Sequence, residues 1–193
     1  MTVRETAVRA YREGLPALAT SVVGGLLAGV VLGGMRAEFR AVPGLLVLVP
    51  ALLATRGNVY GSLGARLATA LHQGLVEPRL GTDADERLAR AVAATIASGL
   101  FASVFAAIVA WLLLVALGQA SAGVLTLVAI ALVAGLLSGV ALSATVVVVV
   151  FAGYRRGYNP DTLVGPIVTT AGDVFGVAFL LAAVRIVLFL GGA

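Results

Sequence analysis

A single carboxylate lies deep inside an apolar segment near the end of the chain. The run LVGPIVTTAGDVFGVAFLLAAVRIV, residues 163–187, is long and apolar enough to cross a membrane, and Asp173 lies near its middle. The other eight acidic residues fall in predicted loops or at the ends of predicted spans. Because a charged side chain at the centre of a membrane helix costs roughly 2.5–3.5 kcal/mol, Asp173 needs a partner or a water-filled cavity. We therefore predict that Asp173 belongs to a cation or proton site.

Hydroxyl groups flank this carboxylate on the predicted helix. Thr169 and Thr170 precede Asp173 by four and three residues, a spacing that places their side chains beside it. Pro166 lies two turns earlier, where its missing backbone donor would weaken or break the helix. We predict an open, polar helix face made of Pro166, Thr169, Asp173 and Gly176.

A second polar face is predicted about one hundred residues earlier. Pro50 removes a backbone donor inside an apolar run, and Gly57 and Gly61 weaken the helix on either side of Asn58. We predict a kinked or broken helix with freed carbonyl groups near Gly57, which at membrane depth persist only against protein or a wet cavity. Asn58, Gly61 and Ser62 share one side of this helix. That side suits either a pore wall or close helix packing, because small residues and a lone Asn also serve helix contacts.

Two arginines are candidate partners of Asp173. Arg185 follows it by twelve residues, a rise of about 18 Å along a helix, so contact within one span is excluded. We expect the side chain of Arg185 to extend toward the outer membrane interface. Arg56 could reach Asp173 if two helices cross. The sequence leaves open whether Asp173 pairs with Arg56 or binds a cation or a proton.

The oxygen-rich set of candidate ligands favours a hard cation. Carboxylate, amide, hydroxyl and carbonyl oxygens suit Mg²⁺, Ca²⁺ or Mn²⁺, whereas softer metals require Cys or clustered His. The chain has no cysteine, and its single histidine, His72, is expected to be solvated at a helix end. With one carboxylate per chain, Mg²⁺ would keep most of its water shell, and a twofold-symmetric homodimer could bring two Asp173 side chains to one pore.

The elements that must position these residues are membrane helices. Of the 193 residues, 61% are hydrophobic and 11% are charged, and the mean hydropathy is +1.10, which is typical of a polytopic membrane protein. The apolar blocks are continuous rather than alternating, which argues against barrel strands and predicts an all-α fold. We predict one transmembrane domain over residues 1–193, with five spans near residues 15–35, 41–71, 91–117, 122–152 and 164–190.

The distribution of arginine predicts how these spans are oriented. Arg36 and Arg40 fall on one side of the membrane, and the richer opposite side is cytoplasmic; it holds Arg4, Arg9, Arg12, Arg79, Arg87, Arg90, Arg155 and Arg156. We predict a multi-pass protein of the plasma membrane with a cytoplasmic N-terminus and an outer C-terminus. The pI near 10.3 then reflects topology, and no nucleic-acid partner is expected.

Two segments are predicted to lie outside the bilayer. Residues 1–14 form an amphipathic helix on the cytoplasmic membrane surface. Residues 72–90 form a cytoplasmic loop in which Thr82 or Asp83 caps the next helix. Neither segment is large enough for a soluble regulatory domain, and we expect none on this chain.

Two segments resemble the MgtE family of magnesium channels and transporters, including the related eukaryotic solute carriers. The run PALLATRGN, from Pro50 to Asn58, is similar to the family's second-span pattern, in which Asn follows Pro by eight residues. The run NPDTLVGPIVTTAGD, from Asn159 to Asp173, is similar to its fifth-span pattern. The resemblance covers the membrane domain of the family and nearly the whole chain.

This resemblance implies a homodimeric pore whose second and fifth spans line the ion path. The carboxylate that matches Asp173 would be the central ion ligand, and Asn58 would face the same path. Asp161 and Asn159 would attract cations at the cytoplasmic mouth. Two positions depart from the family pattern: Arg56 replaces the first Gly of a Gly-Gly-Asn run, and Asn159 stands where many members have Asp.

We predict a divalent cation channel or transporter, with Mg²⁺ as the transported ion. Asp173, Asn58, Thr169, Thr170, Ser62 and carbonyls near Gly57 would form its path. Two alternatives remain open: a proton- or sodium-coupled carrier in which Asp173 is protonated during the cycle, and a non-transporting membrane subunit in which Asp173 pairs with Arg56. An enzyme is not expected, because no paired carboxylates and no nucleophile with a base are placed at membrane depth.

Overall fold

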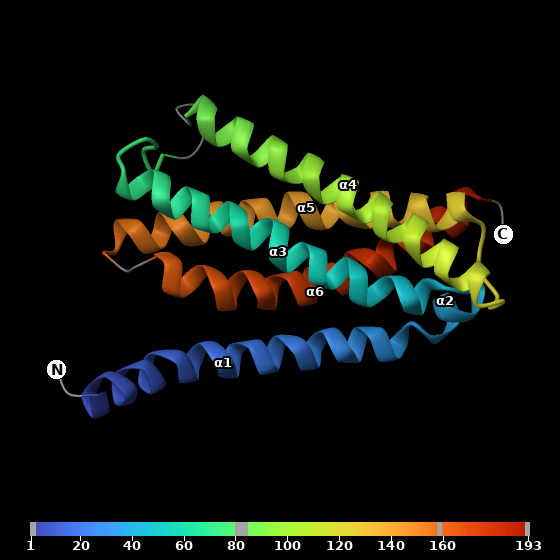
Figure 1. Ribbon diagram of the computed structural model, residues 1–193, viewed down its shortest axis with the longest axis horizontal. Coiled ribbons are helices and arrows are strands. Elements are labelled where there is room, and N and C mark those ends of the chain that lie inside the picture. The colour runs from blue at the N-terminus through green and yellow to red at the C-terminus, as the bar shows by residue number, and fades with distance from the viewer. Residues whose placement is uncertain (1–2, 80–84, 158–159, 192–193) are drawn as a thin grey trace.

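The protein is a bundle of long helices. The computed structural model describes the backbone of residues 3–79, 85–157 and 160–191, and the side chains at positions 11, 15, 18–79, 85–157 and 164–191. Over these residues every regular element is a helix, which confirms the all-α prediction: α1 (Val3–Gly34), α2 (Arg36–Ala41), α3 (Leu45–His72), α4 (Glu86–Ala116), α5 (Val124–Arg155) and α6 (Pro160–Leu190). Figure 1 shows α3, α4, α5 and α6 running side by side, with α1 lying along one edge of the bundle next to α6.

The helices are long and apolar enough for a multi-pass membrane protein. Within the described residues, four stretches meet the length and hydropathy of a membrane span: Leu45–His72, Glu86–Ala116, Val124–Arg155 and Val164–Leu190. A shorter apolar stretch, Leu18–Gly34, lies in α1. Membrane insertion through several helices is therefore supported, and the fifth span stays a prediction.

The ends of two predicted segments differ from the structure. α4 begins at Glu86, so the loop after α3 ends at residue 85 rather than at residue 90. Asp85 is the N-cap, because its Oδ1 accepts a hydrogen bond of 2.8 Å from the backbone N–H of Arg87, whereas Thr82 and Asp83 lie outside the described residues. α1 is continuous from Val3 to Gly34. Residues 3–14 thus extend the first apolar helix instead of forming a separate one, since most of them are good helix formers.

The helix break predicted at Pro50, Gly61 and Pro166 is absent. α3 is unbroken from Leu45 to His72, and α6 is unbroken from Pro160 to Leu190. Each proline lies within the first two turns of its helix, where its missing N–H leaves a single carbonyl without its helical partner, a loss that membrane helices tolerate. The prediction of a broken second span is wrong, and a kink stays a prediction.

Small residues bring the central helices close together. α5 contacts α3, α4 and α6. A Cβ atom added at Gly135 would lie 2.9 Å from Oγ of Ser103, and one added at Gly139 would lie 2.5 Å from the hydroxyl oxygen of Tyr60. Such close approach is typical of membrane helices, because association there relies on van der Waals contact rather than on the exclusion of water.

A polar layer separates two apolar clusters along α3. One cluster includes Leu48 and Leu52, and the other includes Tyr60 and Leu63. Arg56 lies between the two clusters and is buried. The interior of the bundle is therefore apolar on either side of Arg56, which is a charged side chain at mid-depth.

Candidate ion pathway

The register of α3 against α6 places the two predicted polar faces at one level. A Cβ atom added at Gly64 would lie 2.3 Å from Cγ1 of Val164, and one added at Gly176 would lie 2.8 Å from Nη1 of Arg56. Later residues of α3 thus meet earlier residues of α6, so the two helices run antiparallel. Since Asp173 lies between Val164 and Gly176, these two contacts place it at about the level of Asn58.

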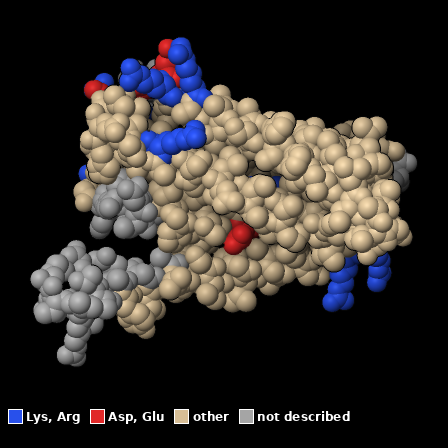
Figure 2. All heavy atoms as spheres, viewed as in Figure 1, with Lys and Arg blue, Asp and Glu red and all other residues tan. Residues whose placement is uncertain are grey.

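Asp173 lies on the lateral surface of the bundle, and no described charged group contacts it. Its side chain is partly exposed, and among the described residues it has no hydrogen-bond or ion-pair partner. Figure 2 shows an isolated acidic patch about halfway along the lateral surface, with most other charged groups on this face near the two ends. A carboxylate at this depth requires water, a cation or a second protein surface.

The predicted face of α3 is open beside it. Asn58 and Ser62 are exposed, and nothing lies within 4 Å of a Cβ atom added at Gly57 or Gly61. The hydroxyl of Ser62 donates a hydrogen bond of 2.8 Å to the carbonyl of Val59, which leaves its lone pairs free to accept. Gly57 lies inside the unbroken α3. It therefore contributes space, since a helical carbonyl already accepts from the N–H four residues later.

The side chains of the two threonines before Asp173 lie in different environments. Thr169 is exposed and donates a hydrogen bond of 2.8 Å to the carbonyl of Gly165. Thr170 donates to the carbonyl of Pro166 at 2.8 Å, and its hydroxyl lies 3.2 Å from Oγ of Ser21 in α1. Thr170 thus belongs to the contact between α1 and α6, whereas Thr169 stays available on the surface.

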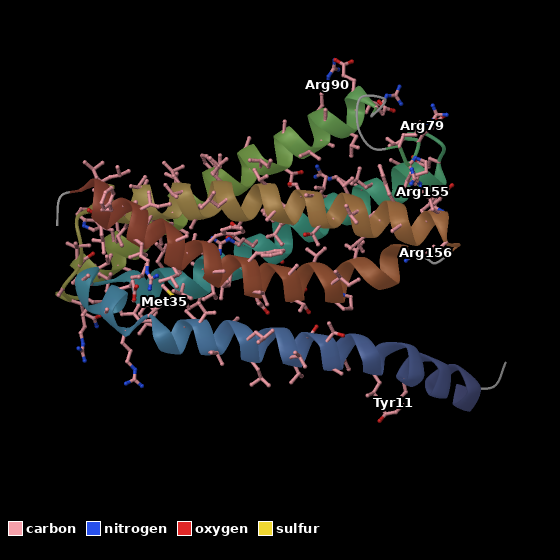
Figure 3. All side chains as sticks on the ribbon, turned by 180° about the vertical axis from the view of Figure 1, so that it is seen from behind. Tyr11, Met35, Arg79, Arg90, Arg155 and Arg156 are labelled. Atoms are coloured by element: carbon pink, nitrogen blue, oxygen red, sulfur yellow. The ribbon has the colours of Figure 1, made fainter. Side chains whose placement is uncertain are left out.

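The side chains of the predicted cytoplasmic mouth are not among those that the structure describes. Asn159 lies outside the described residues, and Asp161 lies in α6 by its backbone only. Their role stays a prediction. Figure 3 shows Arg79, Arg90, Arg155 and Arg156 at one end of the bundle and Met35 at the other. The end that holds these four arginines is the one predicted to face the cytoplasm.

The burial of Arg56, and its lack of a hydrogen-bond partner among the described residues, could not be predicted from the sequence. Arg56 is only 4% exposed, and its Nε, Nη1 and Nη2 atoms have no hydrogen-bond partner among the described residues. The ion pair with Asp173 considered above is therefore not formed. Together with Thr55, Tyr60 and Ser103, Arg56 lines a small cavity with room for about one water molecule.

A closed ion pair is found instead at the end of the bundle where α2 lies. Nε of Arg185 lies 3.0 Å from Oε1 of Glu38 in α2. Glu38 is buried, while the side chain of Arg185 is 68% exposed, and its extension toward the outer membrane interface stays a prediction. Hydrogen bonds from the backbone N–H of Glu38 and from Arg185 hold the pKa of this carboxyl below its usual value. The pairing was not foreseen, because residues 147 positions apart give no local signal.

The described part of the chain offers no protein cage for a metal ion. Among these residues, no three His, Cys, Asp or Glu side chains come together. A divalent cation at Asp173 would therefore keep much of its water shell, as Mg²⁺ commonly does in proteins.

Comparison with known proteins identifies the family to which this sequence is related. The sequence matches the MgtE family, described as a divalent cation transporter, over residues 49–183. It is 31% identical to solute carrier family 41 member 2 of Xenopus laevis over 74% of this chain and 25% of the relative. It is 27% identical to solute carrier family 41 member 3 of Rattus norvegicus over 83% of this chain and 35% of the relative. The chain thus spans about a quarter to a third of the length of these relatives, and no solved structure matches it. The match over residues 49–183 includes both Asn58 and Asp173, and the chain belongs to the MgtE family of divalent cation transporters.

Proposed function

We propose that this chain forms a homodimeric path for divalent cations, with Mg²⁺ as the transported ion and Asp173 at its midpoint. One observation supports this most strongly. A carboxylate without a partner among the described residues lies level with Asn58, on neighbouring helices of a protein from a family of divalent cation transporters. Such an intramembrane charge is expensive unless an ion or water compensates it.

The proposed chemistry is partial replacement of the ion's water shell. The carboxylate of Asp173 would attract the cation directly or through one water molecule. The exposed amide of Asn58 and the hydroxyls of Ser62 and Thr169 would bind water molecules of the shell. Binding through water is weak enough to allow release, which a conducting site requires.

The exposure of these residues supports a role for a second copy of the chain. Asn58, Ser62 and Thr169 are exposed on a single chain. A twofold axis beside α3 and α6 would turn these open faces toward each other and would bring two Asp173 carboxylates to one path. Burial against the partner would also remove these polar groups from contact with lipid.

The arginine-rich end of the bundle would face the cytoplasm of a plasma-membrane protein. The N-terminus would then lie inside and the C-terminus outside, with Asp161 and Asn159 attracting cations at the inner mouth. Cytoplasmic loops are enriched in basic residues because positively charged segments are poorly translocated.

The test is ion flux through purified protein in liposomes. Wild-type protein and Asp173→Asn are compared with Mg²⁺, Ca²⁺, Mn²⁺ and Na⁺, with and without proton and sodium gradients. We expect saturable Mg²⁺ flux that falls by about 100-fold in Asp173→Asn, because a lost charged ligand is worth about 3 kcal/mol. Thermal melting and particle size should match those of wild-type protein.

Each other outcome has a defined meaning. Equal flux in wild type and Asp173→Asn would rule out Asp173 as the ion ligand. A wild-type protein that moves no cation would favour the non-transporting subunit. Flux that collapses without a proton or sodium gradient would favour the coupled carrier, and a monomeric particle would contradict the shared path.

A further inference from the structure

The guanidinium of Arg56 is a buried positive charge that the function proposed above does not use. Its three nitrogen atoms have no hydrogen-bond partner in the described part of the chain, and the residue is 4% exposed. An arginine does not lose its proton in a protein, so the charge persists. A buried charge without compensation is strongly unfavourable. Arg56 therefore needs a counter-charge nearby.

The neutral groups around Arg56 do not provide one. Tyr60, Thr55 and Ser103 line the same small cavity. The hydroxyls of Thr55 and Ser103 already donate to the carbonyls of Leu52 and Gly99, at 3.0 and 2.8 Å. A hydroxyl dipole or a water molecule can solvate the guanidinium but leaves its net charge in place.

Among the described residues, Asp173 is an acidic group close to Arg56. Nη1 of Arg56 lies 2.8 Å from the position of a Cβ atom at Gly176, and Asp173 precedes Gly176 by three residues on α6. Because Cβ atoms three residues apart on a helix are separated by about 5–6 Å, Nη1 lies at most about 9 Å from Cβ of Asp173. The two opposite charges are thus near neighbours that are not in contact.

We infer that Arg56 is a tethered counter-cation of Asp173 that competes with the transported ion and sets its affinity. This inference rests on the function proposed above. In the absence of an ion, the guanidinium balances the carboxylate. A divalent cation that binds at Asp173 is repelled by Arg56, which at this separation and in a medium of low polarity is a sizeable effect. The repulsion weakens binding and lets the ion leave toward either side.

Neutral substitutions of Arg56 separate this role from packing. Arg56→Gln and Arg56→Met remove the charge and keep much of the length of the side chain, and Arg56→Lys keeps the charge. Arg66→Gln is the matched control, because Arg66 is exposed on the same helix, ten residues and about 15 Å further along. The same substitutions are also made in an Asp173→Asn background.

The experiment measures Mg²⁺ affinity of the full chain by calorimetry in nanodiscs and by saturation of flux in liposomes. We expect Arg56→Gln and Arg56→Met to bind Mg²⁺ at least about tenfold more tightly than wild type, with a lower maximum flux. Arg56→Lys and Arg66→Gln should stay within about threefold of wild type. In the Asp173→Asn background, saturable Mg²⁺ binding should be lost, and neutralising Arg56 should not restore it to the wild-type level.

Two kinds of failure are distinguishable. Unchanged Mg²⁺ affinity in a folded neutral variant would overturn the inference about Arg56 and leave the proposed function intact. A wild-type protein with neither saturable Mg²⁺ binding nor flux would overturn the proposed function itself. If both neutral variants fail to fold while Arg56→Lys folds, the charge has a structural role and the inference is wrong.

Discussion

Two regions of this molecule each combine a carboxylate on one helix with an arginine on another, and they differ in whether the charges meet. At the end of the bundle near α2, Nε of Arg185 lies 3.0 Å from Glu38, which is buried. At mid-depth, Arg56 is buried and Asp173 is partly exposed, and neither has a partner among the described residues. The first pair is closed, and the second is open.

The closed pair and the open pair differ in what their charges can do. The Glu38–Arg185 pair joins α2 to α6, and the exposed guanidinium keeps part of its hydration while it bonds to the carboxylate. A closed pair of this kind is sufficient for a structural connection. The open pair leaves the carboxylate of Asp173 without an ion-pair partner among the described residues. Under the function proposed above, a transported cation would bind there without first breaking a salt bridge.

The largest expected effect tests this contrast directly. Asp173→Asn should lower Mg²⁺ flux in liposomes by about 100-fold, because it removes the charged ligand proposed for the ion. Glu38→Gln should leave flux within about twofold of wild type, because its carboxylate already has a partner. A comparable loss of flux in both variants would mean that the two carboxylates do not differ in function.

A smaller loss of Mg²⁺ flux is expected when Asn58 on α3 is replaced. Asn58→Leu should lower maximum Mg²⁺ flux by about tenfold, since the loss of one amide that binds the water shell is worth about 1.4 kcal/mol. Gln73→Leu removes an exposed amide just beyond the end of α3 and is the matched control. Flux that is equal in these two variants would remove Asn58 from the path and favour a packing role.

The closed pair should contribute modestly to stability. Glu38→Gln or Arg185→Gln should lower the free energy of unfolding in detergent by about 0.5–1 kcal/mol, and the double variant should lose little more. The pKa of Glu38 is lowered in the folded state, so this stabilisation is present above the unfolded value of 4.5 and is lost as the pH falls through the lower folded pKa. Thermal melting of wild type and Glu38→Gln should therefore converge under acidic conditions. A difference that grows below pH 4.5 would contradict the pairing.

The smallest effect separates two adjacent threonines. Thr169→Val should lower flux by about threefold, as expected for one hydroxyl that binds water. Thr170→Val should change flux by less than about twofold, since its hydroxyl contacts Ser21 in α1. If Thr170→Val has the larger effect on flux, then α1 and α6 separate during transport or Thr170 faces the path in the dimer.

Several features could be predicted from local sequence alone. Asp173 and Asn58 stand out because polar residues inside apolar runs are costly at membrane depth, whatever the neighbouring helices are. Helix content and the positions of the long spans follow from uninterrupted apolar composition in the same way. The second span was predicted to be kinked or broken; a break is wrong because α3 continues through Pro50, whose missing N–H a membrane helix tolerates, and a kink stays a prediction.

Other features depend on packing that no local pattern encodes. Thr169 and Thr170 are consecutive, and only the presence of α1 beside α6 determines which hydroxyl stays exposed. Glu38 and Arg185 meet because α2 packs against the end of α6. Tyr60 is held between α4 and α5 because Gly99 and Gly139 have no side chain at the contact.

Local composition is enough to predict membrane helices with one carboxylate at depth, because the cost of moving each side chain into hydrocarbon does not depend on its distant neighbours. The level of Asp173 with Asn58, and the position of Arg56 near Asp173 without contact, come from the packing of the helices. Charge interactions depend on the separation between helices, which local sequence does not encode. That separation is determined by where small residues such as Gly64 and Gly176 let α3 and α6 approach each other.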